Sequence, residues 1–152
     1  MDRCGWTGRA RVVRARSEEA GRNPDLRGTF ALVVARSFAT PPVTAEAAAP
    51  FLRPDGLLLV SEPPSEPRDG ILRESGPSAR WPRAPLADLG LAPLERYWDG
   101  FGFAVLRQVV PCPDRFPRRT GIPGKRPLYQ PDAGGSGSPG SAPDPGTPSF
   151  RA

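Results

Sequence analysis

Two continuous apolar runs, separated by a helix-like segment, dominate the pattern of hydrophobic and polar positions. The runs are FALVVA at residues 30–35 and LLLV at residues 57–60. Short runs of this kind are typical of strands buried in a parallel sheet. Residues 44–52 between them are rich in alanine, and Pro41 and Pro42 stand where a helix would begin. A turn is indicated at residues 53–56 by RPDG. Together the segments predict one βαβ unit with a right-handed crossover.

The flanking segments add weaker strand signals. The β-branched run at residues 11–14 is compatible with a strand, and the SEEA that follows indicates a loop or short helix. Residues 94–98 and 101–110 are strand candidates, and the Asp99-Gly100 pair between them predicts an antiparallel hairpin. The aromatic residues near this hairpin are expected to pack in the core or on the hairpin. These residues are Trp81, Tyr97, Trp98, Phe101 and Phe103.

Composition limits how much of the chain can fold. The 152 residues suffice for one domain, but 22 prolines and 17 glycines make up about a quarter of them, and only 38% are hydrophobic. Residues 61–85 are rich in Pro, Ser, Glu and Arg and are expected to form a long irregular connection. Residues 129–152 form a Gly/Ser/Pro-rich tail that is expected to be disordered.

Charge and reactive residues narrow the chemistry. The formal charge of +5 favours a polyanionic partner such as nucleic acid, although a basic balance alone is weakly specific. The absence of histidine excludes Ser-His-Asp and Cys-His nucleophilic sites and all His-based metal sites. Two distant cysteines, Cys4 and Cys112, indicate neither a zinc site nor a disulfide framework. The first residues show no signal-peptide pattern, and no apolar run approaches the roughly 20 residues of a membrane span. We therefore expect a cytoplasmic monomer that binds no metal.

Three segments, in the same order, resemble the family of small-subunit ribosomal RNA (guanine-N(7)) methyltransferases, also called glucose-inhibited division protein B. VVRARSEE at residues 12–19 is similar to that family's strand followed by Arg-Ala-Glu. FALVVARSFA at residues 30–39 is similar to its Phe-Asp-hydrophobic strand that ends in Ala-Arg-Ala. RFPRRTGIPGKRPL at residues 115–128 resembles its C-terminal signature of aromatic-Pro-Arg, Gly-x-Pro and Lys-x-Pro-Leu, and is the most specific of the three.

The resemblance implies a fold with identifiable gaps. It implies an α/β, class I methyltransferase (Rossmann-like) sheet that lacks its first strands and ends in an antiparallel hairpin. Residues 1–128 would be the C-terminal part of that domain, with a basic segment at residues 111–128. The family's glycine-rich cofactor loop has no counterpart here. The family's Asp after Phe30 is Ala31, and Ser61-Glu62 stands where many members carry Lys-Gly.

The resemblance also implies site residues and a cofactor. Ser17, Glu18 and Arg36 match positions of the family's S-adenosylmethionine site. A strand's carboxyl end is where ligands bind in open α/β sheets, and a guanidinium there can hold a carboxylate bidentately. The basic segment, with aromatic residues beside it, would bind ribosomal RNA. Its five cations are Arg115, Arg118, Arg119, Lys125 and Arg126.

Three functions remain open at this point. The first is methylation of a guanine N7 in small-subunit ribosomal RNA. The second is a catalytically inactive fragment that binds nucleic acid through the basic segment alone. The third is a methyltransferase-like protein with another substrate, which is favoured by the anionic Glu62 near the expected active-site edge. Simpler interpretations of the site residues also stand: a solvated acidic turn at Glu18, a surface arginine at Arg36 and a solvated basic tail.

Overall fold

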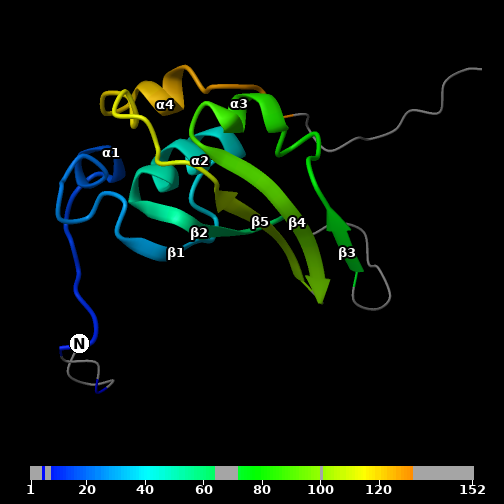
Figure 1. Cartoon of the computed structure of the whole chain (residues 1–152), viewed down its shortest axis with the longest axis horizontal. Helices are drawn as coiled ribbons and strands as arrows, with labels where there is room; N and C mark the ends of the chain where they lie inside the picture. Colours follow the sequence, from blue (N-terminus) through cyan, green and yellow to red (C-terminus); the bar gives the residue numbers. More distant parts are fainter. Residues whose placement is uncertain (1–4, 6–7, 64–71, 100, 132–152) are drawn as a thin grey trace, which may run out of the picture.

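The described part of the chain is a mixed α/β structure in which one five-stranded sheet carries its helices on a single face (Figure 1). The computed structural model describes residues 5, 8–63, 72–99 and 101–131. The strands are β1 (Phe30–Ala35), β2 (Leu52–Ser61), β3 (Leu72–Ser75), β4 (Leu91–Asp99) and β5 (Phe101–Gln108). The helices are α1 (Ser17–Ala20), α2 (Pro41–Ala48), α3 (Arg83–Ala87) and α4 (Ile122–Lys125), with a 3₁₀ turn at Ala49–Phe51.

The predicted βαβ unit is confirmed. β1 pairs with β2 in parallel, and α2 crosses between them. Thr40 is extended just before the helix, and Pro41 and Pro42 occupy its first positions, where proline's missing N–H costs nothing. Figure 1 shows α2 above the sheet, close to β1 and β2. This unit places the end of β1 next to the end of β2.

The turn predicted at residues 53–56 is wrong, because these residues lie within β2. The pairing with β1 jumps from Phe30 opposite Leu52 to Leu32 opposite Leu57, so the extra residues form a bulge. Asp55 has a φ of 62°, and a Cβ on Gly56 would stand 2.8 Å from the carbonyl oxygen of Arg53. The RPDG signal therefore marks an irregularity inside a strand, and only glycine fits at Gly56.

The hairpin is also confirmed, with a longer first strand and a slightly shorter second strand than predicted. β4 and β5 pair antiparallel up to Asp99 opposite Phe101, while Gly100 lies outside the described residues. β4 begins at Leu91 and contains a register shift between Pro93 and Glu95. The sheet order is β1-β2-β5-β4-β3, so the hairpin joins the parallel pair through β5 and β2.

Three expectations from the sequence need correction. Residues 11–14 form no strand, and Val12 and Val13 are 73% and 48% exposed. β1 is an edge strand with mostly exposed side chains, because its only pairing among the described residues is with β2. The connection at residues 61–85 contains β3 and the start of α3, and residues 64–71 lie outside the described part. Among the described residues the sheet therefore ends at β1.

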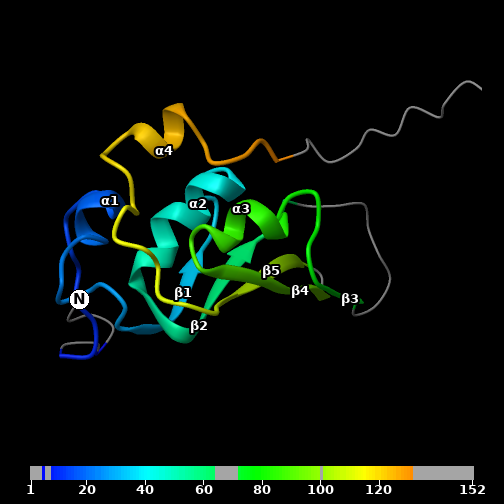
Figure 2. The same cartoon turned by 45° about the horizontal axis from the view of Figure 1, so that its top comes forward.

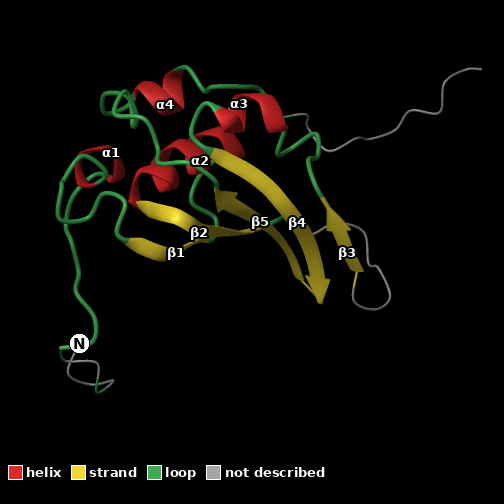
Figure 3. Ribbon diagram, in the orientation of Figure 1, coloured by secondary structure: helices red, strands yellow, loops and turns green. Residues whose placement is uncertain are grey.

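The hydrophobic core lies between the sheet and the helices. Figures 2 and 3 show α2, α3 and α4 on the same side of the strands. Trp81 is 1% exposed and is among the largest fully buried side chains. The core also contains buried residues from α2, from β2, β4 and β5 and from the segments around α3, among them Ala45, Leu52, Leu58, Leu86, Leu89, Leu91, Ala104 and Leu106.

The basic segment at residues 111–128 is bound to the rest of the fold by specific contacts. Arg27 donates to the carbonyl oxygens of Cys112, Pro113 and Phe116 at 2.8 to 3.0 Å. Phe116 is 5% exposed, and burial raises the pKa of the Cys112 thiol to about 11. This segment is therefore part of the folded domain.

The predicted boundary of the tail at residue 129 is too early. Tyr129 packs against the core, and its hydroxyl donates to the carbonyl oxygen of Arg80 at 3.1 Å. Burial raises the pKa of Tyr129. The remainder of the predicted tail, residues 132–152, lies outside the described residues.

Candidate functional site

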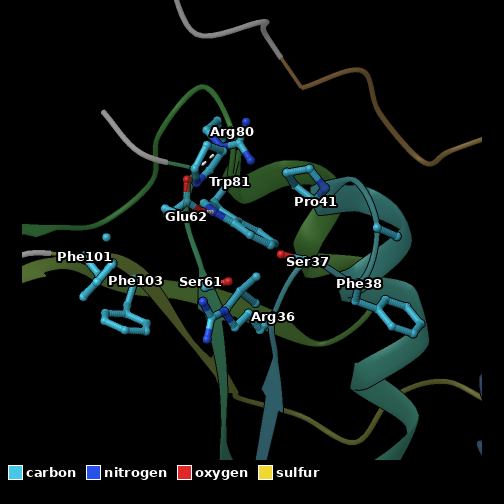
Figure 4. A pocket seen from close by; sticks show the side chains of 14 residues that line it. Arg36, Ser37, Phe38, Pro41, Ser61, Glu62, Arg80, Trp81, Phe101 and Phe103 are labelled. Atoms are coloured by element: carbon cyan, nitrogen blue, oxygen red, sulfur yellow. Dashed lines mark hydrogen bonds and ion pairs between the residues drawn. The ribbon is translucent and has the colours of Figure 1, made fainter. Parts of the chain in front are cut away.

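A sizeable cavity lies at the carboxyl ends of the two parallel strands. Its volume is about 570 Å³, which is within the roughly 300–1,000 Å³ of small-molecule sites. The segment after β1, the end of β2 and the start of β5 supply its walls, and Trp81 and Arg80 close one side (Figure 4). We call it the large cavity. Its lining includes Arg36, Ser37, Phe38, Ser61, Glu62, Arg80, Trp81, Phe101 and Phe103.

Arg36 brings a positive charge to this cavity. It follows β1 directly, and Ser37 after it has a φ of 48°, which turns the chain toward α2. Among the described residues no carboxylate pairs with the Arg36 guanidinium, which is exposed. Phe101 and Phe103 lie on one side of Arg36 in Figure 4 and Phe38 on the other. The arrangement can bind an anionic group beside aromatic surfaces.

Glu62 does not present an unbalanced negative charge to the cavity. Its side chain is 6% exposed, and it accepts a hydrogen bond from Arg80 Nε at 2.7 Å. Trp81 Nε1 also donates to it at 2.7 Å. Arg80, from the connection at residues 61–85, therefore compensates the negative charge that Glu62 brings to this position. Trp81 is buried as the sequence predicts, but its contact with Glu62 and the whole role of Arg80 were not predicted, because both residues lie in a segment that gave only loop signals.

Ser17 and Glu18 lie apart from the large cavity. Ser17 lines a second cavity of about 130 Å³, which we call the small cavity. Its wall is otherwise mostly apolar and comes from β1, α2 and Phe51. Phe38 lines both cavities, so the two are neighbours separated by this ring. Arg36 and Ser17 therefore line neighbouring cavities near the carboxyl end of β1.

Glu18 holds the basic segment in place. One of its carboxylate oxygens accepts the backbone N–H of Gly121 at 3.1 Å, and the other accepts the Ser17 hydroxyl at 3.1 Å. The Gly121 hydrogen bond lowers the pKa of Glu18. Each carboxylate oxygen of Glu18 therefore has a hydrogen-bond partner within the protein, and the contact with Gly121 ties the basic segment to α1.

The five predicted RNA-binding cations fall into two groups. Arg118 makes a bidentate ion pair with Glu46, whose side chain is fully buried. These hydrogen bonds raise the pKa of Arg118. The other four cations are exposed, and Arg115 is only 3.8 Å from the Asp88 carboxylate in a solvated pair. The exposed cations are Arg115, Arg119, Lys125 and Arg126.

Among the described residues no helix is both long enough and apolar enough to cross a membrane. None of the His, Cys, Asp and Glu side chains of these residues gather in threes as a metal site would require.

Comparison with known proteins gives related sequences but no matching family model. The chain is 34% identical over 119 residues to a ribosomal RNA small subunit methyltransferase G from Deinococcus deserti, covering 78% of this chain and 48% of that protein. A protein of the same name from Prochlorococcus marinus strain MIT 9313 is 34% identical over 126 residues, 83% of this chain and 50% of its own length. One from Pelotomaculum thermopropionicum is 30% identical over 119 residues, which cover 78% of this chain and 49% of that protein. The chain spans about half the length of these curated relatives.

Proposed function

Because this chain belongs to the ribosomal RNA small subunit methyltransferase G family, we propose that it takes part in S-adenosylmethionine-dependent methylation of a guanine N7 in small-subunit ribosomal RNA. Family membership rests on identities of 30 to 35% over about four fifths of the chain. The observation that carries the proposal is the large cavity, where an exposed arginine and aromatic side chains meet at the ends of parallel strands.

The residues of the two cavities fit parts of such a cofactor. S-adenosylmethionine, when bound, supplies an electrophilic methyl group on a sulfonium centre and carries a carboxylate. Arg36 would hold that carboxylate, since its guanidinium has no carboxylate partner in the described part of the chain. Ser17 on the apolar small cavity would face the adenine end. The family's glycine-rich cofactor loop has no counterpart in this sequence, so these contacts alone would bind the cofactor weakly.

The chemistry needs positioning more than proton transfer. Guanine N7 is an unprotonated ring nitrogen with an in-plane lone pair, so no base has to remove a proton before methylation. The complete absence of histidine is compatible with this requirement. Phe101 and Phe103 would contact the exposed base, and the compensated Glu62 adds no repulsion toward the RNA. The protein's task would be to align the base with the methyl group.

Methyl transfer to unmethylated small-subunit ribosomal RNA tests the proposal. The assay should use millimolar cofactor because binding is expected to be weak, and the modified atom should be mapped by strand cleavage at N7-methylguanine. Arg36→Ala should lower the rate about 10- to 150-fold, as expected for loss of hydrogen bonds to a charged group worth roughly 1.5–3 kcal/mol. Arg53→Ala is the matched control, because Arg53 is exposed on β2 and does not line the large cavity. Equal rates for the two variants would remove Arg36 from the site, and transfer to another atom would favour a different substrate.

A second function, RNA binding without catalysis, is favoured by the exposed cations of the basic segment. Four exposed cations that each neutralise one phosphate predict a slope of log affinity against log salt of about −2.8 to −3.6. Replacing Arg119, Lys125 and Arg126 with Ala should flatten the slope by about 2 to 3. The control triple variant replaces Arg11, Arg14 and Arg53, which are exposed elsewhere.

The two functions are separated by their combined results. RNA binding that depends on the basic segment, together with no methyl transfer at any cofactor concentration, would support the inactive RNA-binding fragment. A slope that falls equally in both triple variants would show that the basic segment has no special role. Arg118 is retained in every variant, because its removal would leave the buried Glu46 carboxylate without its partner.

A further inference from the structure

Two cations and one carboxylate are the charged side chains of the described residues that line the large cavity. They are Arg36, Arg80 and Glu62. Glu62 pairs with Arg80, so the lining carries one positive charge in excess. Arg36 lies apart from that pair in Figure 4, near Ser61. The proposed cofactor contact uses only Arg36, which leaves Arg80 as a second cation on the cavity wall.

The Arg80 guanidinium has unused hydrogen-bond donors. Its Nε donates to a Glu62 carboxylate oxygen at 2.7 Å, while its side chain remains 28% exposed. Within the described ranges neither of its Nη atoms has a hydrogen-bond or ion-pair partner. These atoms carry the remaining N–H donors of the side chain, and such a pair of donors matches two oxygens of a phosphate. Arg80 can therefore keep its contact with Glu62 and bind an anion at the same time.

Both the side chain and the backbone of Arg80 are held in place. Glu62 also accepts a hydrogen bond from Trp81 Nε1 at 2.7 Å, and Trp81 is 1% exposed. The backbone N–H of Glu62 donates to the carbonyl oxygen of Gly102 at 2.7 Å, which fixes Glu62 just beyond the end of β2. The Tyr129 hydroxyl donates to the Arg80 carbonyl oxygen at 3.1 Å. A side chain that is already ordered loses less conformational entropy when it binds a ligand, which favours affinity.

A nucleotide is the ligand class that fits this combination of groups. It carries an aromatic base and a phosphate, and the cavity combines the rings of Phe101 and Phe103 with the Arg80 guanidinium. Phe101 is 73% exposed, so its ring is accessible to a base. Aromatic side chains stack on exposed bases, and arginine binds phosphate oxygens bidentately.

We propose that Arg80 binds a phosphate of the nucleotide whose base enters the large cavity, and that Glu62 and Trp81 are the residues that position it. A phosphate of this kind has two sources, an RNA chain and a free nucleotide. That the base belongs to ribosomal RNA rests on the proposed function. The family resemblance does not supply this site, because Ser61-Glu62 stands where many members carry Lys-Gly.

The surroundings of Arg80 favour RNA as the source of the phosphate. Tyr129, which contacts the Arg80 backbone, follows Lys125 and Arg126 of the basic segment closely in the sequence. Both of these cations are exposed. Figures 1 and 2 show the chain after α4 running above α3. An RNA chain with one phosphate on Arg80 would bring its neighbouring phosphates toward these cations, whereas a free nucleotide would leave them without a ligand.

The test changes both partners of the pair, because an Arg80 variant alone would leave the Glu62 carboxylate, only 6% exposed, without its cation. Arg80→Met with Glu62→Gln removes one positive and one negative charge, so the net charge of the chain does not change. We expect this double variant to bind a single-stranded oligonucleotide of small-subunit ribosomal RNA sequence about tenfold more weakly than the unmodified chain. The slope of log affinity against log salt should become shallower by about 0.7 to 0.9, the contribution of one phosphate. If Arg80 served only to neutralise Glu62, the affinity and the slope would both stay unchanged.

Glu74→Gln with Arg96→Met is the matched control. These residues form a partly exposed ion pair between β3 and β4, and neither lines the large cavity. The control should bind the oligonucleotide with unchanged affinity and slope. Urea denaturation checks that both double variants are folded. If the Arg80 double variant does not fold, Arg80→Lys takes its place, because lysine keeps the charge and can pair with Glu62. A single ammonium lacks the second pair of donors, so its affinity should still fall severalfold.

Guanosine monophosphate and guanosine, tested beside the oligonucleotide, distinguish the two sources of the phosphate. Guanosine monophosphate that binds as tightly as the oligonucleotide, with the same loss in the Arg80 variant, would identify a free nucleotide and keep the phosphate on Arg80. The proposal is overturned if the Arg80 variant keeps the affinity and slope of the unmodified chain, if the control loses as much, or if no ligand binds. Arg80-dependent RNA binding without methyl transfer would refute the proposed function alone. Methyl transfer with RNA binding that does not depend on Arg80 would refute this inference alone.

Discussion

The ion pair between Glu46 and Arg118 leads to a prediction about stability that can be worked out from the structure. Glu46 lies in α2, and its side chain is fully buried. Arg118 donates to it from the backbone N–H at 2.8 Å, from Nε at 2.9 and 3.1 Å, and from Nη2 at 2.6 Å. The perturbation is Arg118→Ala, which leaves the buried carboxylate with the backbone N–H of residue 118 as its only donor among the described residues.

The expected loss of folding stability depends on which partner is removed, because Glu46 is fully buried whereas Arg118 is partly exposed. Removing one partner of a buried ion pair typically costs about 3–5 kcal/mol, and the surviving backbone hydrogen bond favours the lower end. Glu46→Gln should cost less, about 1–2 kcal/mol, since the Arg118 side chain is 27% exposed and can regain water. We expect a total stability on the order of a few kcal/mol for a sheet covered on one face. Arg118→Ala should therefore leave much of the chain unfolded at 25 °C.

Urea denaturation followed by far-ultraviolet circular dichroism measures these differences. Arg119→Ala is the control, because Arg119 is the exposed neighbour and should change the stability by no more than about 0.5 kcal/mol. If Arg118→Ala does not fold, the double variant with Glu46→Gln should recover folding, because the uncompensated charge is gone. The reasoning is refuted if Arg118→Ala is as stable as Arg119→Ala, or if Glu46→Gln costs more than Arg118→Ala.

Three further predictions concern the cofactor, pH and local stability. Titration calorimetry should show S-adenosylmethionine binding no tighter than about 1 mM, because the contacts of a glycine-rich loop are missing, and a micromolar dissociation constant would contradict this. Glu18→Gln should lower stability more at pH 7 than at pH 3. The folded-state pKa of Glu18 is lowered, so its contribution to folding stability is present above the unfolded pKa near 4.3 and is lost as pH falls through the folded-state pKa. Equal losses of stability at both pH values would contradict this prediction. Hydrogen exchange should be slowest in β5, the central strand of the sheet, and in its neighbour β2, and fast at residues 11–14; strong protection at 11–14 would contradict the structure, in which these residues form no strand.

Local signals predicted the elements whose formation depends on nearby residues. The βαβ unit follows from two apolar runs and a proline-started helix, and the hairpin from Asp99-Gly100. The bulge at Gly56 was mistaken for a turn because RPDG has the residues that either structure requires. Only the pairing of Leu32 with Leu57 distinguishes a bulge from a turn here, and this pairing forms only when the two strands come together in the fold.

The site could be predicted only in part, for the same reason. Arg36 follows a strand that the sequence predicts, and it lines the large cavity, as expected of a residue at the carboxyl end of a parallel strand. Arg80 and Trp81 have no local signal, because their role comes from contact with Glu62, 18 and 19 residues earlier in the chain. Arg118 looked like one of five equivalent cations, and only the burial of Glu46, 72 residues away, sets it apart.

The strand at residues 30–35 is informative because the sequence and the structure disagree about its burial. An edge strand exposed on one face is usually protected by charges or by alternation of polar and apolar residues, whereas Phe30–Ala35 has neither. A continuous apolar run reflects the environment in which a strand functions, and that environment has protein on both faces. The described residues supply protein on only one face. The excess apolar surface of β1 is therefore explained if another polypeptide segment covers it, and the exposed Val34 is the position where this explanation can be tested most directly.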